Sequence, residues 1–107
     1  MDVITNNNIK CTIALAALEN VKDPEIGLNV VDLGLIYELN FDEDKKLVSC
    51  NMTLTTQFCP MGESITGGVK NALQNTFGDD SIEVNLIFEP SWNTNMISEE
   101  GQLFLTR

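Results

Sequence analysis

The chain has 107 residues, enough for one domain, and its hydrophobic content of 43% is sufficient for a buried core. Its net charge of −10 and its few, scattered basic residues exclude the basic patch that a nucleic-acid-binding protein needs. Histidine is absent, which excludes Ser-His-Asp and Cys-His catalysis within one chain. Three cysteines, without a signal-peptide pattern or an apolar run of membrane-spanning length, predict a cytoplasmic protein with no membrane association.

The N-terminal part predicts a tail followed by a helix. Residues 1–8 are rich in asparagine and predict a flexible tail, so we expect the single domain to occupy residues 9–107. Apolar residues at helical spacing predict a first helix over residues 8–21, with Asn8 as a candidate N-cap. Its expected buried stripe is Ile9, Ile13, Ala14, Ala17, Leu18 and Val21. Cys11 lies outside this stripe, and no chemical role is expected for it.

Two strands are predicted to follow. Apolar and polar residues alternate over residues 33–41 and again over residues 48–55, which is typical of half-buried strands. The charged segment 42–46 between them predicts a hairpin loop and therefore antiparallel pairing. Cys50 falls on the apolar face of the second strand, where a cysteine usually acts as a small core residue.

The C-terminal half predicts a second helix and a third strand. The helix should follow Cys59 and end at Gly78, and the strand should run from Ile82 to Phe88 before Pro90. Residues 91–93 predict a turn, and residues 96–105 a short helical turn with a docked extended tail. The order α-β-β-α-β predicts a single small α+β domain with a three-stranded mixed sheet. We expect both helices to cover one face of that sheet, and the third strand to lie beside a hairpin strand.

Cys59 is the strongest candidate for chemistry. It lies where the strand pattern stops and the helical pattern starts, directly before Pro60, which suits the first position inside a helix. Cys59 is therefore the expected N-cap, and the free amides and the helix dipole there favour thiolate over thiol. A thiolate attacks electrophiles and binds metal. The alternative is a buried structural cysteine at the strand–helix corner.

Acidic residues form the second group of candidates. Asp23, Glu25 and Asp32 lie in or near loops at one end of the predicted first strand. Carboxylates there can bind a hard cation or act as acid and base. The alternative is a structural role in helix ending and turn hydrogen bonds.

Two threonines and the tryptophan complete the candidates. Thr55 and Thr56 precede Cys59 closely, and their hydroxyls can orient a ligand or bond the turn backbone. Trp92 follows a proline-containing turn, where it can stack on a partner or belong to the core or an interface.

Four short motifs occur in an order that resembles a known family. They are Asp23-Pro24-Glu25, Val31-Asp32-Leu33-Gly34-Leu35-Ile36-Tyr37, Met52-Thr53-Leu54-Thr55 leading to Cys59-Pro60, and Pro90-Ser91-Trp92. Over most of its length the chain is similar to the iron–sulfur assembly family once called domain of unknown function fifty-nine, with SufT-like and PaaD-like members. Because the cysteine-rich tail of PaaD-like members is not seen, the resemblance favours the SufT-like type.

The resemblance implies an α+β fold and a role in delivering or assembling iron–sulfur clusters. It implies Cys59 as the cluster-binding or metal-binding residue, supported by Asp23, Glu25 and Asp32. One plausible thiolate per chain cannot supply the full thiolate set of a stable cluster, and a homodimer would supply two. We therefore expect a transient iron–sulfur cluster or iron, and no tightly bound cofactor.

Three functional hypotheses follow. The first is an auxiliary factor that carries cluster or iron from assembly machinery to client apoproteins. The second is a metal-free adaptor that docks this machinery to clients through Trp92 and the acidic loops. The third is a small enzyme with Cys59 as nucleophile and Asp23 or Asp32 as base, which is the weakest because histidine is absent.

Overall fold

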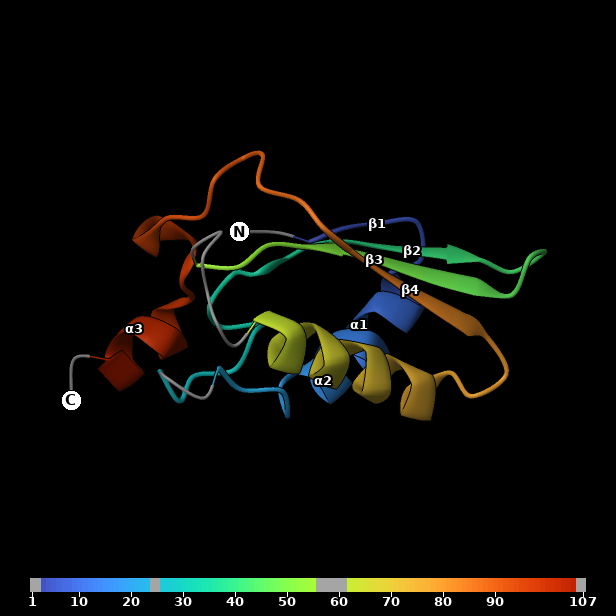
Figure 1. Cartoon of the computed structure of the whole chain (residues 1–107), viewed down its shortest axis with the longest axis horizontal. Coiled ribbons are helices and arrows are strands. Elements are labelled where there is room, and N and C mark those ends of the chain that lie inside the picture. Colours follow the sequence, from blue (N-terminus) through green and yellow to red (C-terminus); the bar gives the residue numbers. More distant parts are fainter. Residues whose placement is uncertain (1–2, 24–25, 56–61, 106–107) are drawn as a thin grey trace.

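The computed structural model describes residues 3–23, 26–55 and 62–105, and within them it forms a sheet covered on one face by two helices (Figure 1). A third, short helix lies at the C-terminal end of the described chain. The elements in chain order are β1 Ile4–Thr5, α1 Asn8–Leu18, β2 Ile36–Asp42, β3 Leu47–Met52, α2 Gly62–Thr76, β4 Ser81–Leu86, a 3-10 turn Thr94–Met96 and α3 Glu99–Leu105.

The sheet has the order β1-β2-β3-β4. β2 and β3 form the predicted antiparallel hairpin, and β4 lies parallel to β3, as expected for a strand that returns through a crossover helix. The prediction of three strands was wrong, because Ile4–Thr5 from the expected tail add a fourth strand, parallel to β2. The register between β2 and β3 shifts at Ile36 and Glu38, where Tyr37 is the extra residue of a bulge.

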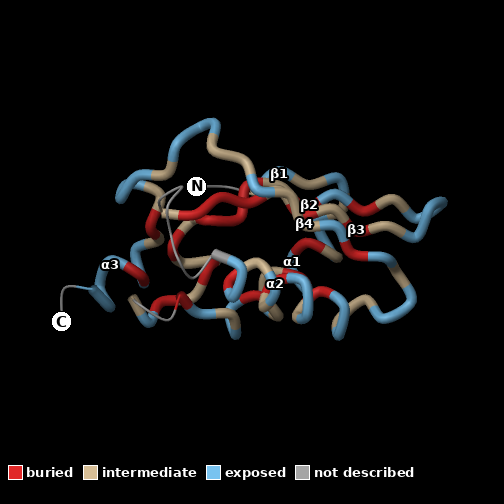
Figure 2. Tube along the Cα trace, in the orientation of Figure 1, coloured by how far each residue is buried: buried red, intermediate tan, exposed pale blue. Residues whose placement is uncertain are grey.

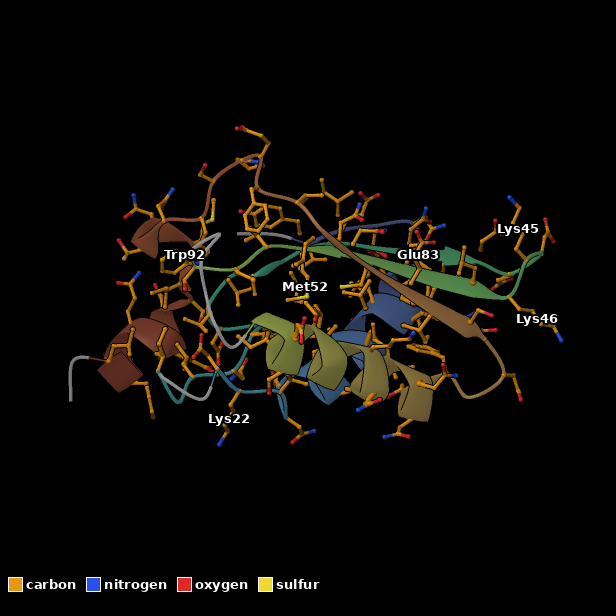
Figure 3. All side chains as sticks on the ribbon, in the orientation of Figure 1. Lys22, Lys45, Lys46, Met52, Glu83 and Trp92 are labelled. Carbon is orange, nitrogen blue, oxygen red and sulfur yellow. The ribbon has the colours of Figure 1, made fainter. Side chains whose placement is uncertain are left out.

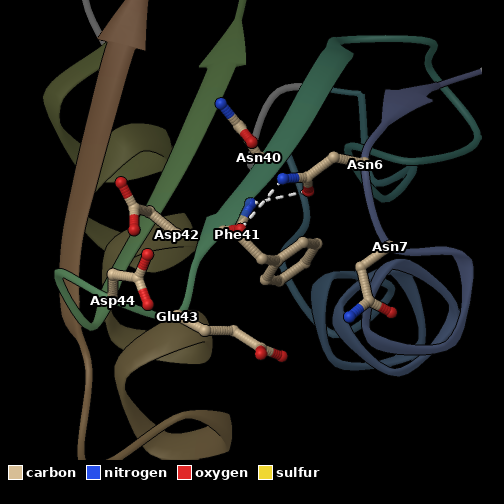
Figure 4. Close-up of a pocket in the computed structure, with 7 residues that line it drawn as sticks. All are labelled: Asn6, Asn7, Asn40, Phe41, Asp42, Glu43 and Asp44. Atoms are coloured by element: carbon tan, nitrogen blue, oxygen red, sulfur yellow. Dashed lines mark hydrogen bonds between the residues drawn. The ribbon is translucent and has the colours of Figure 1, made fainter.

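The side chain of Asn6 extends the short pairing of β1 with β2, because its amide group bonds to the backbone of Phe41 as a neighbouring strand would. Its amide nitrogen donates to the carbonyl oxygen of Phe41 at 2.9 Å, and its amide oxygen accepts from the N–H of Phe41 at 2.9 Å (Figure 4). The next residue, Asn7, is the N-cap of α1 and accepts from the N–H of Lys10. The cap therefore precedes the predicted one, Asn8, by one residue.

Helix α1 is rotated relative to the predicted orientation. Cys11, Ala14 and Leu18 are buried, whereas Ile9 is 77% and Ile13 is 48% exposed. The predicted stripe was wrong at these two isoleucines and at Cys11, because apolar residues lie all around this helix and their spacing does not select one face. The helix also ends at Leu18, before the predicted residue 21, and the chain turns into the loop that follows.

The core lies between the sheet and the two long helices (Figure 2). Alternate residues of β3 are buried, which confirms the strand phase and the placement of Cys50 in the core. The buried residues of α2 are spaced by one helical turn and face the sheet. The fully buried side chains at the centre of this interface include Leu39, Val48, Cys50, Met52, Ile65, Val69 and Leu73.

The C-terminal segment is helical where an extended tail was predicted. Ser98 precedes α3, and its hydroxyl oxygen accepts from the N–H of Gly101 at 3.0 Å, as an N-cap does. Glu99 and Glu100 in the first turn stabilise the helix, because their negative charges lie at the positive end of the helix dipole. Gly101 is buried, and a Cβ there would come within 3.0 Å of Leu28, so the absence of a side chain lets α3 dock closely.

Candidate functional site

The structure describes part of the predicted site. Cys59, Thr56 and Glu25 lie outside the described residues. Asp23, Asp32 and Thr55 are described, and the following paragraphs give their surroundings.

Asp23 organises the loop between α1 and β2. Its side chain is buried, with 2% of its surface exposed, and one carboxylate oxygen accepts from the N–H of Ile26 at 3.3 Å. Its backbone bonds close the loop, since its N–H donates to Leu28 at 3.0 Å and its carbonyl accepts from Gly27 at 2.7 Å. Gly27 has a φ of 83°, a conformation that glycine adopts without strain. These contacts fit the turn-forming role that the sequence left open for Asp23.

Asp32 joins this loop to the C-terminal segment. One carboxylate oxygen accepts from the hydroxyl of Ser98 at 2.8 Å, and the other accepts from the side-chain amide of Asn29 at 2.7 Å. The backbone carbonyl of Asp32 also accepts from the N–H of Ser98 at 2.8 Å. Sequence reasoning missed Ser98 and Asn29, although a serine before two glutamates is a recognisable helix start. The described contacts of Asp32 are thus structural.

Thr55 lies in a bend just beyond β3, where it is half-buried. The preceding residues are anchored, because the N–H of Thr53 donates to the carbonyl of Leu35 at 2.8 Å. Thr53 is fully buried, although the sequence had not singled it out. The chain therefore leaves the sheet from a fixed point before it enters the segment that contains Cys59.

Tyr37 was not among the predicted site residues, but it connects two segments near them. Its hydroxyl donates to the carbonyl oxygen of Pro90 at 2.7 Å and lies 3.6 Å from the sulfur of Met96. Burial raises the pKa of Tyr37 above its usual value of 10.0, and a hydrogen bond with Thr53 opposes this effect. The phenol is therefore neutral at physiological pH and fastens the C-terminal segment to the start of β2.

Trp92 lies at the end of the molecule that carries α3 (Figure 3). Its indole N–H donates to the carbonyl oxygen of Leu33 at 2.6 Å, and its ring is half-buried against the core. Beside it, Gly34 has a φ of 75°, and a Cβ there would collide with the backbone carbonyl of Met96. The observed contacts of Trp92 are those of a residue that fixes the C-terminal segment, and its role in partner binding stays a prediction.

The described cysteines are both buried. Cys11 is 5% exposed and Cys50 is fully buried, and neither forms a disulfide. Burial raises the pKa of the Cys50 thiol from 9.0 to about 12. Cys50 is therefore a neutral core thiol at physiological pH, which confirms its assignment to the core.

Within residues 3–23, 26–55 and 62–105, no three acidic or cysteine side chains come together as a metal site. An open hollow of about 590 Å³ lies instead at the β2–β3 hairpin (Figure 4). Two of its three acidic residues already have partners, since Glu43 pairs with Lys10 at 3.1 Å and Asp42 accepts from the N–H of Lys45 at 3.0 Å. Figure 1 shows the β2–β3 hairpin, and with it this hollow, at the end of the molecule opposite α3, to which Asp32 is bonded through Ser98.

The helices in the described parts of the chain do not meet the requirements of a membrane-spanning helix. None of the helices there has both the length and the apolar character needed to cross a bilayer.

Comparison with known proteins identifies the family. The family model described as iron–sulfur cluster assembly protein matches residues 13–86. An Fe-S protein maturation auxiliary factor of Porphyromonas gingivalis is 42% identical over 88 residues, which cover 82% of this chain and 83% of the relative. The Fe-S protein maturation auxiliary factor SufT of Staphylococcus aureus is 39% identical over 85 residues, covering 79% of this chain and 96% of the relative.

Solved structures agree with this result. A domain of unknown function DUF59 from Bacillus anthracis superposes with a TM-score of 0.83 at 32% identity, covering 94% of this chain and 98% of that one. Rv1466 from Mycobacterium tuberculosis, described as associated with [Fe-S] complex assembly and repair, has a TM-score of 0.52 at 34% identity, covering 89% and 82% of the two chains. The chain therefore belongs to the iron–sulfur cluster assembly protein family, as its motifs indicated.

Proposed function

We propose that this chain is an auxiliary factor of iron–sulfur protein maturation that receives a cluster or iron through Cys59 and passes it to client apoproteins. Its relatives named as maturation auxiliary factors support the general role. The observation that supports Cys59 is the state of the other two thiols. Cys11 and Cys50 are both buried, and the pKa of Cys50 is raised to about 12. Cys59 is the remaining cysteine of the chain.

The cargo is held transiently in this proposal. Iron–sulfur clusters are usually held by several thiolates, and one chain offers Cys59 alone. Further ligands would come from small thiols, from the client protein or from a second chain. Asp23 and Asp32 act in this scheme by shaping the loop, since the carboxylate of Asp32 already accepts from Ser98 and Asn29. Glu25, Thr55 and Thr56 are proposed as further supporting residues near the thiol.

The proposed role is not catalytic. Both carboxylate oxygens of Asp32 already accept a hydrogen bond, of 2.8 and 2.7 Å, and these bonds favour the ionised form and hold the side chain against Ser98 and Asn29. Asp23 is buried and bonded within its own loop. The partners are the iron–sulfur assembly machinery and client apoproteins, and an acidic chain is suited to contact basic surfaces on them.

Anaerobic reconstitution with iron and sulfide tests the role of Cys59. The wild type should acquire substoichiometric iron–sulfur absorption that a chelator removes easily. Cys59→Ser should lose this absorption, and the matched control Cys11→Ser should keep it, because Cys11 is buried in the core. Equal absorption in the wild type and Cys59→Ser would refute the assignment of the thiol.

The second candidate is the metal-free adaptor. The acidic hairpin at Asp42, Glu43 and Asp44 favours it, because Glu43 and Asp44 are exposed and offer a charged surface to a protein partner. Trp92 would contribute through the part of its ring that remains exposed. If no iron binds under any condition, and deletion of the gene still lowers the activity of iron–sulfur enzymes, the adaptor replaces the carrier.

A further inference from the structure

Strand β4 is an edge of the sheet with unused backbone groups. It pairs with β3 on one side, and no other strand among the described residues lies beyond it. The N–H of Ser81 donates to Lys46 at 2.7 Å and the N–H of Ile87 donates to Met52 at 2.8 Å, both toward the hairpin. Because backbone direction alternates along a strand, the N–H and C=O groups of the even-numbered residues 82, 84 and 86 point away from the sheet. Such an edge is a template for another strand.

A groove accompanies this edge. It has a volume of about 390 Å³ and lies between β4 and α2, with Gly67 and Val84 among its lining residues. A Cβ at Gly67 would meet no atom within 4 Å, and Leu86 at the end of the strand is 43% exposed. Helix α2 therefore covers the apolar side of the edge strand incompletely.

The sequence of β4 is self-complementary in one antiparallel register. If two copies pair with Val84 opposite Val84, Ile82 of each lies opposite Leu86 of the other. Every outward backbone group then gains a partner, and the apolar side chains form one row on the helix side of the sheet. Glu83 lies opposite Asn85 of the second copy, so that this register avoids facing carboxylates.

Two charged residues of α2 are placed so that the same two-fold axis would pair them with opposite charges. Glu63 and Lys70 both line the groove and flank Gly67 on either side along the helix. A two-fold axis that pairs the β4 strands also makes the two α2 helices antiparallel. Glu63 of one copy then meets Lys70 of the other, and the second such pair follows by symmetry. Within the described part of the chain, neither side chain has an ion pair of its own.

We propose that two copies of this chain associate through β4 and α2 into a dimer with one continuous sheet. A second copy fits this edge for two reasons. A two-fold axis places the apolar residues of the two β4 strands opposite one another, and it places Glu63 of each α2 opposite Lys70 of the other. The proposal does not depend on the proposed function. It has a consequence for that function, since each dimer would carry two copies of Cys59.

Charge reversal on α2 tests the interface. Sedimentation velocity over a concentration series should be run on the wild type, Glu63→Lys, Lys70→Glu and the double variant. Each single reversal places like charges together and should raise the dissociation constant by roughly tenfold or more. The double variant restores both pairs and should dimerise about as well as the wild type.

Overall charge repulsion between two acidic chains predicts a different result for these variants. Glu63→Lys lowers the negative charge of the chain, so repulsion between two acidic chains alone predicts tighter association for this variant. Lys45→Glu on the exposed hairpin is the matched control for Lys70→Glu, and it should leave the dissociation constant nearly unchanged. A wild type that stays monomeric at the highest attainable concentration, or a double variant as weak as the single ones, would overturn the proposal.

Amide hydrogen exchange locates the contact. The N–H groups of Ile82, Val84 and Leu86 should exchange more slowly as the protein concentration rises, and those of β1 at the opposite edge should not change. Concentration-dependent association without this protection, for example through the exposed Ile9 and Ile13 of α1, would also overturn the proposal.

Discussion

The hydroxyl of Ser98 donates to the carboxylate of Asp32 at 2.8 Å, and this bond joins two segments that are 66 residues apart in the sequence. The same hydroxyl oxygen accepts from the N–H of Gly101, so one side chain both caps α3 and fastens it to the loop before β2. Asp32, for which the sequence left a ligand, base or structural role open, thereby connects these two segments.

Disrupting this connection should lower stability. Asp32→Asn keeps the size of the side chain but replaces an acceptor with a donor, and we expect a loss of about 1–2 kcal/mol in the free energy of unfolding. Ser98→Ala should cost about 1 kcal/mol through the lost cap. Urea denaturation measures both, and the double variant should lose less than the sum because the two residues share a bond. Asp44→Asn, at an exposed position, is the control, and an equal loss there would contradict the assignment.

Thiol reactivity should separate the three cysteines. In the folded protein at neutral pH, Cys59 should react with iodoacetamide faster than Cys11 or Cys50, because the latter two are buried. Mass-spectrometric mapping of the labelled peptides identifies the first site to react. Labelling of Cys50 first would mean that the strand phase and the site are both misassigned.

Serine substitution should distinguish core from loop. Cys50 is fully buried, and Cys50→Ser places a hydroxyl among apolar neighbours, so we expect a loss of roughly 1–3 kcal/mol in stability. Cys59→Ser should cost much less, since serine is itself a good N-cap at the position predicted for Cys59. Chemical denaturation of both variants measures the contrast. Equal losses would indicate that Cys59 is a core residue.

Alkaline pH should reduce stability through the buried thiol. The pKa of Cys50 rises from 9.0 to about 12 on folding, so above pH 9 the unfolded chain releases a proton that the folded chain retains. The contribution of the protonated Cys50 thiol to the free energy of unfolding is fully present below pH 9. Between pH 9 and about 12 it falls by up to about 1.4 kcal/mol per pH unit. Cys50→Ala should show a shallower decline in urea denaturation at alkaline pH. A residual slope is expected, because the pKa of Tyr37 is raised in the same direction. An unchanged slope in the variant would exclude Cys50 as the cause.

Elements with one clear apolar face could be predicted from the sequence. β3 alternates strictly and α2 repeats its buried residues at one helical turn, so each pattern is compatible with one orientation. α1 is apolar on all sides, and its orientation is set by packing that spacing does not encode. β1 is two residues long and gains its pairing partly from the side chain of Asn6, which no periodicity reveals.

The family could be predicted from motifs, whereas the contacts of the candidate site residues could be predicted only in part. The motifs identified the family correctly, because several occur in order along the chain. The sequence offered a structural role for Asp32 as the alternative, but its partner Ser98 could not be predicted, since Ser98 comes from a distant segment. The position of Trp92 after a proline-containing turn likewise gave no sign that its indole would bond to Leu33.

The attachment of the C-terminal segment has a practical consequence. The chain contains one tryptophan and one tyrosine, and both fasten this segment. Trp92 donates to Leu33 in the loop before β2, and Tyr37 in β2 donates to Pro90 of the segment. Intrinsic fluorescence is therefore a local signal, and it reports the docking of residues 87–98 separately from the state of the helices. A shift in Trp92 emission at constant helical circular dichroism would mark the release of this segment from an otherwise folded domain.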